Sequence, residues 1–281
     1  MTELTIYQTI FWSLATLLAF YIVPKAAFHF QRLVKAVKNG ETISEPSQNG
    51  VPTAHINVVD VAAVALLFCF FWMGLSQKAS AEPVETRDFT LGVLLGNFIG
   101  QLMLIGLICV IWIFRVNLVE QFGLSLRGRW RTLWWSPAIF VACLVFTNII
   151  IKLQYFEFVK GLNDGPVLQQ AVQVLQECSD PAILTMLAMV ACIGAPLSEE
   201  VLFRGYLFPV IKKYSSPWFA IIFSGAIFSL IHYNLAALPT LFLMGCLLAL
   251  SYERTKSLWV PIIAHTLFNS ATTIAQLLGK Y

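Results

Sequence analysis

Long apolar segments make up most of this chain, and they limit the folds that it can adopt more than any other feature. A helix that spans a membrane needs about 20 predominantly apolar residues, and its backbone polar groups must be hydrogen-bonded within the segment. Apolar runs fall at about residues 7–23, 58–75, 91–114, 133–151, 182–211, 218–233, 238–252 and 258–278. The sequence therefore predicts an all-α, polytopic integral membrane protein with about eight transmembrane helices.

The composition agrees with this class and argues against several others. Hydrophobic residues make up 58% of the chain and charged residues only 12%, whereas charged residues reach about 25% in soluble domains. The net charge of +3 is small and spread over short loops, so we expect no nucleic-acid partner. The six cysteines include no Cys-x-x-Cys pair, which argues against a disulfide framework and a structural zinc site. We expect residues 7–23 to be a retained helix rather than a signal peptide.

Basic residues are concentrated in alternate loops, which predicts an orientation under the positive-inside rule. They follow the first, third, fifth and seventh apolar segments, except for Arg204, which lies near the end of the fifth, and are Lys25, Arg32, Lys35, Lys38, Arg115, Arg127, Arg129, Arg131, Arg204, Lys212, Lys213, Arg254 and Lys256. We therefore expect these loops to be cytoplasmic and both termini to lie on the opposite side of the membrane.

The fifth apolar segment, residues 182–211, is too long for one straight crossing at a rise of about 1.5 Å per residue. Gly194 and Pro196 lie inside it, and proline removes a backbone donor and clashes with the preceding helical turn. We therefore predict a break near Pro196 and a second helix that begins at Ser198.

Three charged residues, Glu199, Glu200 and Arg204, lie within the same apolar segment. An ionisable side chain at membrane depth costs about 2.5–3.5 kcal/mol on insertion scales, so it usually has a partner and a function. Glu200 and Arg204 are four residues apart and can pair along one helix face, whereas Glu199 is turned about 100° away. Glu199 is thus the candidate reactive group. The alternative is that Ser198 caps a helix whose first turn favours acidic residues.

Two histidines in later apolar segments are candidate partners for this carboxylate. His232 ends one segment, where it could equally be an interfacial residue bonded to a loop carbonyl. His265 and Asn269 are one turn apart on the last segment, so they should face a cavity or a partner helix rather than lipid. A structural hydrogen bond between helices would also explain this pair.

Together these residues resemble the motifs of the CPBP family of intramembrane proteases. The motifs are Glu-Glu-x-x-x-Arg at 199–204, Phe-x-x-x-His at 228–232 and His-x-x-x-Asn at 265–269, in this order on apolar segments. The family, also called Abi or CAAX-protease-like, includes the eukaryotic prenyl-protein CAAX endoprotease and many bacterial members. The resemblance covers about residues 134–278. It divides the chain into N-terminal transmembrane helices without a diagnostic motif (1–125) and a protease domain (126–281).

The resemblance implies a catalytic role for four residues. Glu199 would be the general base that activates water, and His232 would share that water. His265 and Asn269 would bind the oxyanion that develops on the tetrahedral intermediate. Fixed donors at that position are worth about 2.7–4 kcal/mol per group in other acyl-transfer enzymes.

Three further residues would support these four. By resemblance, Glu200 and Arg204 would form an ion pair behind the reactive carboxylate. Phe228, one turn before His232, would pack against the site rather than react.

A metal ion could also take part. Glu199, His232 and His265 offer one oxygen and two nitrogens, which could hold Zn²⁺ and leave a position open for water. However, no His-Glu-x-x-His helix is present, and a metal-free glutamate mechanism uses the same residues. The sequence leaves both mechanisms open and favours the metal-free one.

We therefore predict an intramembrane endopeptidase in the core of a helix bundle. Its substrate would be a hydrophobic or lipidated, CAAX-like peptide or protein in the lipid bilayer. Glu199 and Arg204 precede Lys212 and Lys213 by a few helical turns, so the site should be accessible from the cytoplasm. The resemblance to bacterial members implies a bacterial inner membrane.

Two other functions remain as alternatives. The chain could be a non-catalytic immunity factor or scaffold of the same fold, which would tolerate Glu199→Gln. It could also be a small-solute transporter whose buried ionisable groups form an ion path, and a broken helix at Gly194 and Pro196 would favour this function. The two matching inverted halves expected of such a transporter are absent from the sequence.

Overall fold

The computed structural model describes residues 3–39, 50–80, 89–125, 127, 130–153, 155, 159 and 170–279, and no strand occurs among them. The α-helices are α1 (Glu3–Leu17), α2 (Val23–Lys38), α3 (Val58–Ser80), α4 (Leu91–Ile113), α5 (Leu118–Gln121), α6 (Trp135–Lys152), α8 (Gln170–Glu177), α9 (Pro181–Met189), α10 (Ala195–Glu200), α11 (Phe208–Lys213), α12 (Pro217–Leu230), α13 (Leu238–Thr255) and α14 (Trp259–Leu278). The π-helices are η1 (Leu18–Ile22), η4 (Val190–Gly194) and η5 (Val201–Leu207), and η3 (Trp130–Trp134) is a 3₁₀-helix.

Five helical stretches are long and apolar enough to cross a membrane. They are Leu4–Lys38, Val58–Gln77, Leu91–Ile113, Trp130–Lys152 and Pro181–Lys213. The three remaining apolar segments of the sequence correspond to α12, α13 and α14, of which α12 is a shorter apolar helix. The predicted all-helical membrane protein is thus confirmed, whereas the count of eight crossings is not.

Local sequence determines where several helices begin. The side chain of Thr90 accepts a hydrogen bond from the backbone N–H of Val93 at the start of α4. Asp180 and Ser216 cap α9 and α12 in the same way, and each is followed by a proline at the first helical position. Proline is favoured there because that backbone N–H would have no partner within the helix.

The predicted break at Pro196 is wrong, because the helix continues from Pro181 to Lys213 through two π-helices. The N–H of Ala195 bonds to the carbonyl of Val190, five residues earlier, and Pro196 follows directly. The wider π turn accommodates the proline that would clash in an α-helix. The same arrangement precedes Pro209, where the N–H of Phe208 bonds to the carbonyl of Phe203.

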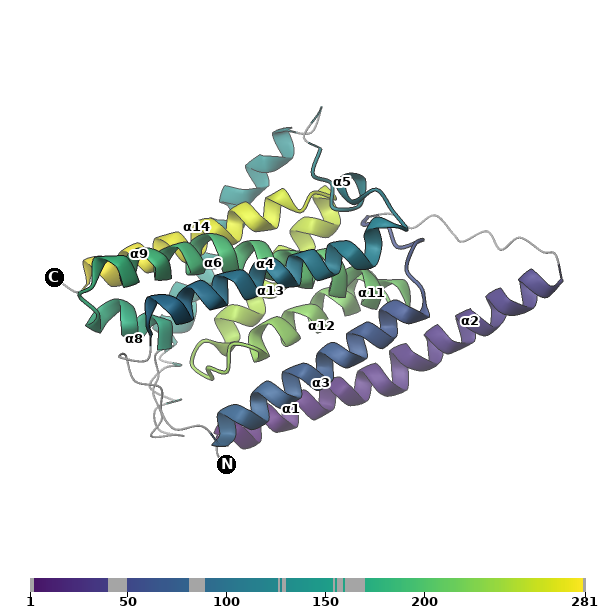
Figure 1. Ribbon diagram of the computed structural model, residues 1–281, viewed down its shortest axis with the longest axis horizontal. Helices are drawn as coiled ribbons and strands as arrows, with labels where there is room; N and C mark the ends of the chain where they lie inside the picture. The colour runs from purple at the N-terminus through teal and green to yellow at the C-terminus, as the bar shows by residue number, and fades with distance from the viewer. Residues whose placement is uncertain are drawn as a thin grey trace.

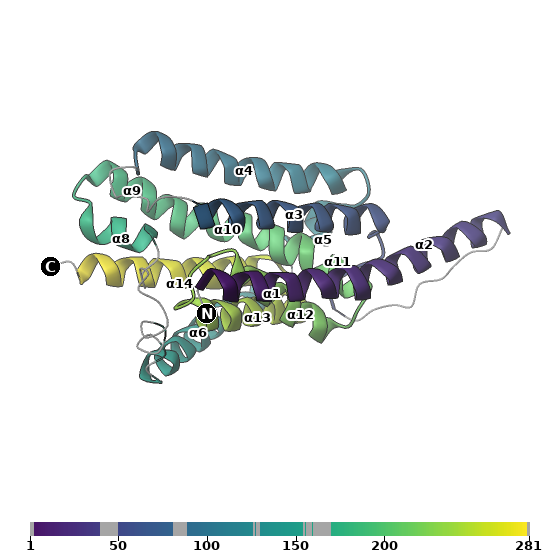
Figure 2. The same cartoon turned by 90° about the horizontal axis from the view of Figure 1, so that it is seen from below.

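The helices form a layered bundle whose long axes run in roughly one direction (Figure 1). Figure 2 shows α4 on one face and α6 toward the opposite face, with α14 and α13 between them. Helix α12 packs along α13, and α6, α13 and α14 pack against one another. Helices α1 and α3 contact each other, and α1 also contacts α12, so the N-terminal helices pack against the motif-bearing ones.

Small residues bring α12 and α13 close together. A Cβ atom on Gly245 would lie 2.8 Å from the Cα of Gly225, so these two backbones touch. Close approach of this kind is typical of helix packing within membranes. It also places the carbonyl of Gly245 beside η5, where the functional residues lie.

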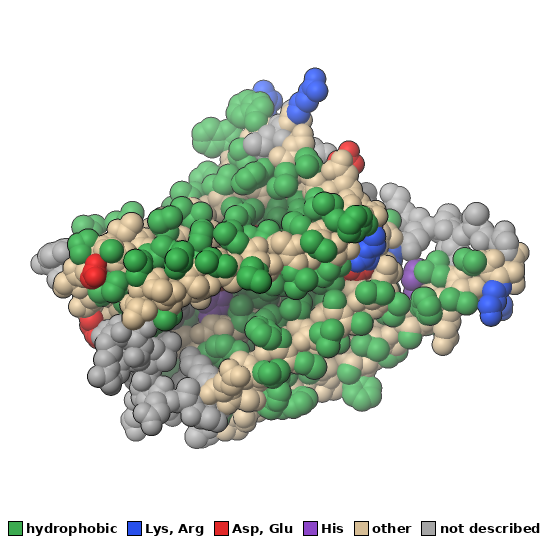
Figure 3. Space-filling view, viewed as in Figure 1, with side chains coloured by type: hydrophobic (Ala, Val, Ile, Leu, Met, Phe, Trp, Pro, Cys, Tyr) green, Lys and Arg blue, Asp and Glu red, His purple; other side chains and the backbone are tan. Residues whose placement is uncertain are grey.

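Apolar side chains cover much of the face of the bundle that Figure 3 shows. Large side chains such as Phe20, Phe70 and Phe114 are 81%, 68% and 91% exposed. Soluble monomers rarely expose contiguous apolar surface on this scale. This surface and the five apolar helices identify the chain as an integral membrane protein in a lipid bilayer.

Candidate active site

Glu200 and Arg204 form an ion pair in the centre of the bundle. Arg204 Nη1 lies 2.6 Å from Glu200 Oε1, and both residues are fully buried. Arg204 Nη2 donates to the carbonyl of Gly245 at 3.0 Å, and the guanidinium lies 4.6 Å from the ring centre of Phe228. A buried charge is tolerated when it is paired and hydrogen-bonded, so each of these contacts stabilises the guanidinium.

His265 is held by the same carboxylate. Its Nδ1 lies 2.8 Å from Glu200 Oε1, and the imidazole is 2% exposed. A carboxylate that is paired with Arg204 only accepts hydrogen bonds, so we assign the imidazole proton to Nδ1. The other ring nitrogen, Nε2, then faces Glu199 and lies 3.9 Å from its Oε2.

His232 approaches Glu199 from the turn that follows α12. Its Nδ1 lies 2.7 Å from the carbonyl oxygen of Phe228, which can only accept, so Nδ1 again carries the proton. Its Nε2 lies 4.0 Å from Glu199 Oε2. Three atoms from separate parts of the chain thus face one another: one carboxylate oxygen and two imidazole nitrogens, all of them acceptors when Glu199 is ionised.

The side chains around these atoms are partly exposed, Glu199 by 21% and His232 by 20%. Glu199 Oε2 itself is buried and has no hydrogen-bond partner among the residues that the structure describes. Figure 3 shows a histidine side chain at the bottom of a hollow in the apolar face. Separations of 3.9 and 4.0 Å are too long for direct hydrogen bonds, and one bridging water would connect Glu199 to the imidazoles.

The spacing of the three atoms fits water better than zinc. Two ligands of a tetrahedral zinc ion, each about 2.0–2.2 Å from the metal, are separated by about 3.3–3.5 Å. The observed separations of 3.9 and 4.0 Å are wider. Hydrogen bonds of about 2.8 Å to one shared water give a separation of about 4 Å when they meet near a right angle. The donor types suit Zn²⁺, but their present spacing does not.

Asn269 lies one turn beyond His265 on α14, but its side-chain amide binds η4 rather than the Glu199 site. Its Nδ2 donates to the carbonyl of Ala191 at 2.8 Å, within the π-helix η4. Among the described residues, its amide makes no hydrogen bond to Glu199, His232 or His265. This bond ties α14 to η4, and the amide retains a second N–H.

Phe228 forms the floor beneath the two imidazoles. It is fully buried, and its ring centre lies 4.9 Å from that of His232 and 5.8 Å from that of His265. Phe203 meets it edge-on at 5.3 Å. The ring therefore fixes the spacing of the imidazoles without offering a reactive group.

Sequence reasoning missed two contributors to this site. The carbonyl of Gly245 binds Arg204, and Tyr233, directly after His232, binds helix α3. Only Tyr233 has a signal in the sequence. It directly follows the motif residue His232, at the end of an apolar segment, and carries a hydroxyl group that can form a hydrogen bond.

Comparison with known proteins agrees with the motif pattern. Residues 181–271 match the family model described as type II CAAX prenyl endopeptidase Rce1-like. The chain is 31% identical over 143 residues to the Bacillus subtilis (strain 168) protein named "Putative membrane peptidase YdiL", covering 51% of this chain and 56% of that protein. It is 31% identical over 151 residues to "Membrane-embedded CAAX protease MroQ" of Staphylococcus aureus (strain USA300), covering 52% and 58%.

A third relative, an uncharacterized 24.3 kDa protein of Escherichia coli, is 34% identical over 102 residues, covering 34% of this chain and 45% of that protein. The chain thus spans about half the length of the curated relatives that it matches. No solved structure matches it.

Proposed function

We propose that this chain is a member of the CPBP family of membrane proteases, and that it is an intramembrane endopeptidase that cleaves a hydrophobic or lipidated peptide. The match of residues 181–271 to the Rce1-like model and the similarity to two membrane peptidases support this proposal. One observation carries the proposal. Glu199 Oε2 faces the Nε2 atoms of His265 and His232 at 3.9 and 4.0 Å, separations that one bridging water would span.

A proton count supports this chemistry. Three acceptors face the shared position, and a water molecule offers only two protons. One of the three groups must therefore carry an extra proton for all contacts to be satisfied. When an imidazole carries it, its Nε2–H can donate to the oxyanion while Glu199 remains a base.

The reaction then proceeds in two steps. Glu199 accepts a proton from water, and the water oxygen bonds to the carbonyl carbon of the peptide, whose oxygen becomes an oxyanion. An imidazolium Nε2–H of His265 or His232 stabilises that oxyanion. When the C–N bond breaks, the proton held by Glu199 passes to the leaving amine, which regenerates the carboxylate.

The orientation of the site follows from the loop charges. Lys212 and Lys213 end the helix that carries Glu199, and basic residues are typical of the cytoplasmic side of a span. We therefore place the active site within reach of the cytoplasmic face of a bacterial inner membrane. The S. aureus relative is named a CAAX protease, which supports a substrate of the CAAX class.

A comparison of membrane peptides tests the proposal. Cells that produce wild-type protein and Glu199→Gln are compared for peptide termini, and Glu120→Gln, an exposed acidic residue in α5, is the control. We expect termini present with wild type and Glu120→Gln to fall by at least about 100-fold with Glu199→Gln, since general-base catalysis contributes about 10²–10⁴-fold. Identical termini in all three would contradict the proposal and favour the non-catalytic scaffold.

The transporter alternative has lost its main support. It relied on a broken helix at Gly194 and Pro196, and the helix is continuous there. Unwound backbone that could coordinate an ion is therefore missing from this part of the described chain.

A further inference from the structure

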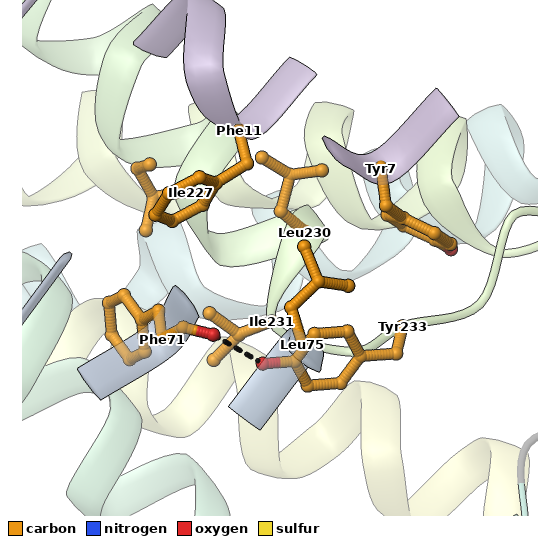
Figure 4. Close-up of a pocket in the computed structure, with 8 residues that line it drawn as sticks. All are labelled: Tyr7, Phe11, Phe71, Leu75, Ile227, Leu230, Ile231 and Tyr233. Carbon is orange, nitrogen blue, oxygen red and sulfur yellow. Dashed lines mark hydrogen bonds between the residues drawn. The ribbon is translucent and has the colours of Figure 1, made fainter. Parts of the chain in front are cut away.

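Tyr233, the residue after His232, joins the turn between α12 and α13 to the N-terminal helices. This turn, which carries His232, is called the catalytic turn below. The hydroxyl of Tyr233 donates to the backbone carbonyl of Phe71 on α3 at 3.1 Å. Figure 4 shows this bond and the apolar side chains around it, which come from α1, α3 and α12. The ring of Tyr7 on α1 meets the Tyr233 ring at 6.4 Å in an edge-to-face arrangement. Two N-terminal helices thus contact the neighbour of a motif histidine.

The backbone at Tyr233 is held in an uncommon conformation. Its φ is +49°, in the left-handed region that bulky residues rarely occupy. Such a conformation persists when the surroundings fix it, and it is often found beside functional residues. The anchored hydroxyl and the edge contact with Tyr7 provide that constraint.

Helix α3 is shaped to receive this hydroxyl. A Cβ atom on Gly74 would lie 2.8 Å from the Tyr233 oxygen, closer than real contacts allow. Glycine at this position therefore permits the bond to Phe71. The ring of Phe71 also stacks on Phe203 at 6.5 Å, and Phe203 contacts Phe228 beneath the imidazoles.

The remainder of the turn is held separately. The hydroxyl of Tyr155 donates to the carbonyl of Leu235 at 3.0 Å, and Asn234 Oδ1 accepts from the N–H of Ala237 at 2.8 Å. These contacts lie beyond Tyr233 in the chain. The Tyr233 anchor is the one of these three side-chain contacts that adjoins His232 in the chain.

We propose that Tyr233 is a positioning residue for His232, and that α1 and α3 serve to hold the catalytic turn in place. This role rests on the endopeptidase function proposed above. The anchor keeps the His232 ring where Nδ1 donates to Phe228 and Nε2 faces Glu199. The N-terminal helices, which carry no family motif, thereby contribute to catalysis without touching substrate.

Matched tyrosine variants test this role. Tyr233→Phe removes a part-buried hydroxyl bond of 3.1 Å to a carbonyl. Tyr252→Phe removes a buried bond of the same length, from α13 to the carbonyl of Gln121. With a peptide found in the membrane-peptide comparison, we expect Tyr233→Phe to lower kcat about tenfold and leave KM within twofold. Tyr252→Phe should keep the wild-type kcat. Equal kcat values for the two variants would overturn the proposal.

A second variant approaches the same bond from the other side. Gly74→Ala should displace the Tyr233 hydroxyl and lower kcat to a similar extent. The double variant with Tyr233→Phe should be no worse than either single change, because both remove one interaction. Additive losses of kcat would show that the two residues act separately and would contradict the shared role.

A readout without proteolysis separates this inference from the proposed function. In protein labelled with ¹⁵N at its four histidines, the His232 signals are assigned with His232→Gln. We expect the Nδ1-protonated signature of His232 to be lost or broadened in Tyr233→Phe and Gly74→Ala, but not in Tyr252→Phe. An unchanged signature in both test variants would overturn the positioning role. If wild type cleaves no peptide but Tyr233→Phe and Gly74→Ala still lose the His232 signature, only the proposed peptidase function is rejected and the positioning role stands.

Discussion

His265 donates its Nδ1 proton to Glu200, whose same oxygen also accepts from Arg204. One buried carboxylate therefore neutralises a cation and orients an imidazole. This shared use distinguishes Glu200 from the adjacent Glu199. Glu200 is committed to structure on one side of the helix, and Glu199 is left to face the two Nε2 atoms.

Replacing Glu200 should separate stability from activity. Glu200→Gln leaves the guanidinium of Arg204 without its ion-pair partner, and breaking a buried pair costs about 3–5 kcal/mol. We expect a lower midpoint of thermal unfolding in detergent and a loss of peptide cleavage. The double variant Glu200→Leu with Arg204→Met removes both charges and should recover much of the stability while remaining inactive. Recovery of cleavage in the double variant would contradict the role of Glu200 in orienting His265.

The roles of the two ring nitrogens of His265 can be separated with a single substitution. In His265→Asn the side-chain amide can still donate to Glu200, but it has no group at the position of Nε2. We expect thermal unfolding close to wild type and a kcat lowered by about 10²–10³-fold, the cost of removing one oxyanion donor elsewhere. His265→Ala, which removes both ring nitrogens, serves as the comparison and should also unfold at a lower temperature.

Chelation distinguishes the water and zinc mechanisms. The Glu199 to imidazole separations of 3.9 and 4.0 Å fit a shared water, so cleavage should survive a strong zinc chelator. The measurement pairs the rate of peptide cleavage with the metal content of the same sample. Loss of activity that is restored by one equivalent of zinc would show that the site contracts around a metal.

The sequence predicted those features of the site that depend on local spacing. Glu200 and Arg204 are four residues apart, so their approach follows from helix geometry alone. The bond from His265 to Glu200 spans 65 residues, and the bond from Tyr233 to α3 spans 162. Such contacts depend on how the helices pack, which no local pattern specifies.

The fold shows the same limit. The apolar runs predicted the helical class, because their length and composition suffice for it. The continuity of the helix through Pro196 could not be predicted, since a proline at that point allows either a break or a π-helix. The continuous helix contains an i to i−5 hydrogen bond from Ala195 to Val190, directly before the proline.

A second buried ion pair should matter for folding but not for chemistry. Asp60 on α3 accepts from Arg115 at 2.8 and 2.9 Å and from Trp112 at 3.0 Å, and its side chain is fully buried. Asp60→Asn should cost about 3 kcal/mol, the lower end for a buried pair because Arg115 is partly exposed. The kcat per folded molecule should equal that of wild type. A lower kcat at unchanged stability would assign Asp60 to the reaction instead.

His55, which lies between α2 and α3, should make the stability of the protein depend on pH. Burial, together with Arg115 and Lys213, lowers the pKa of His55 from 6.5 to about 4, although Asp60 acts in the opposite direction. The folded protein therefore keeps this imidazole neutral at a pH where the unfolded chain protonates it. The contribution of the neutral His55 to the free energy of unfolding is fully present above about pH 6.5. It is lost as the pH falls toward 4, because the unfolded chain then gains a proton that the folded protein does not bind.

Thermal unfolding of wild type and His55→Gln, measured between pH 7 and pH 4, tests this dependence. Because both proteins share every other titrating group, the difference between their unfolding midpoints isolates His55. Wild type should lose stability relative to the variant as the pH falls through this window. Among the described residues, the buried Nε2 of His55 has no hydrogen-bond partner, and the ring lies 4.5 Å from that of Trp112. Parallel curves would show that His55 is nevertheless protonated in the folded protein.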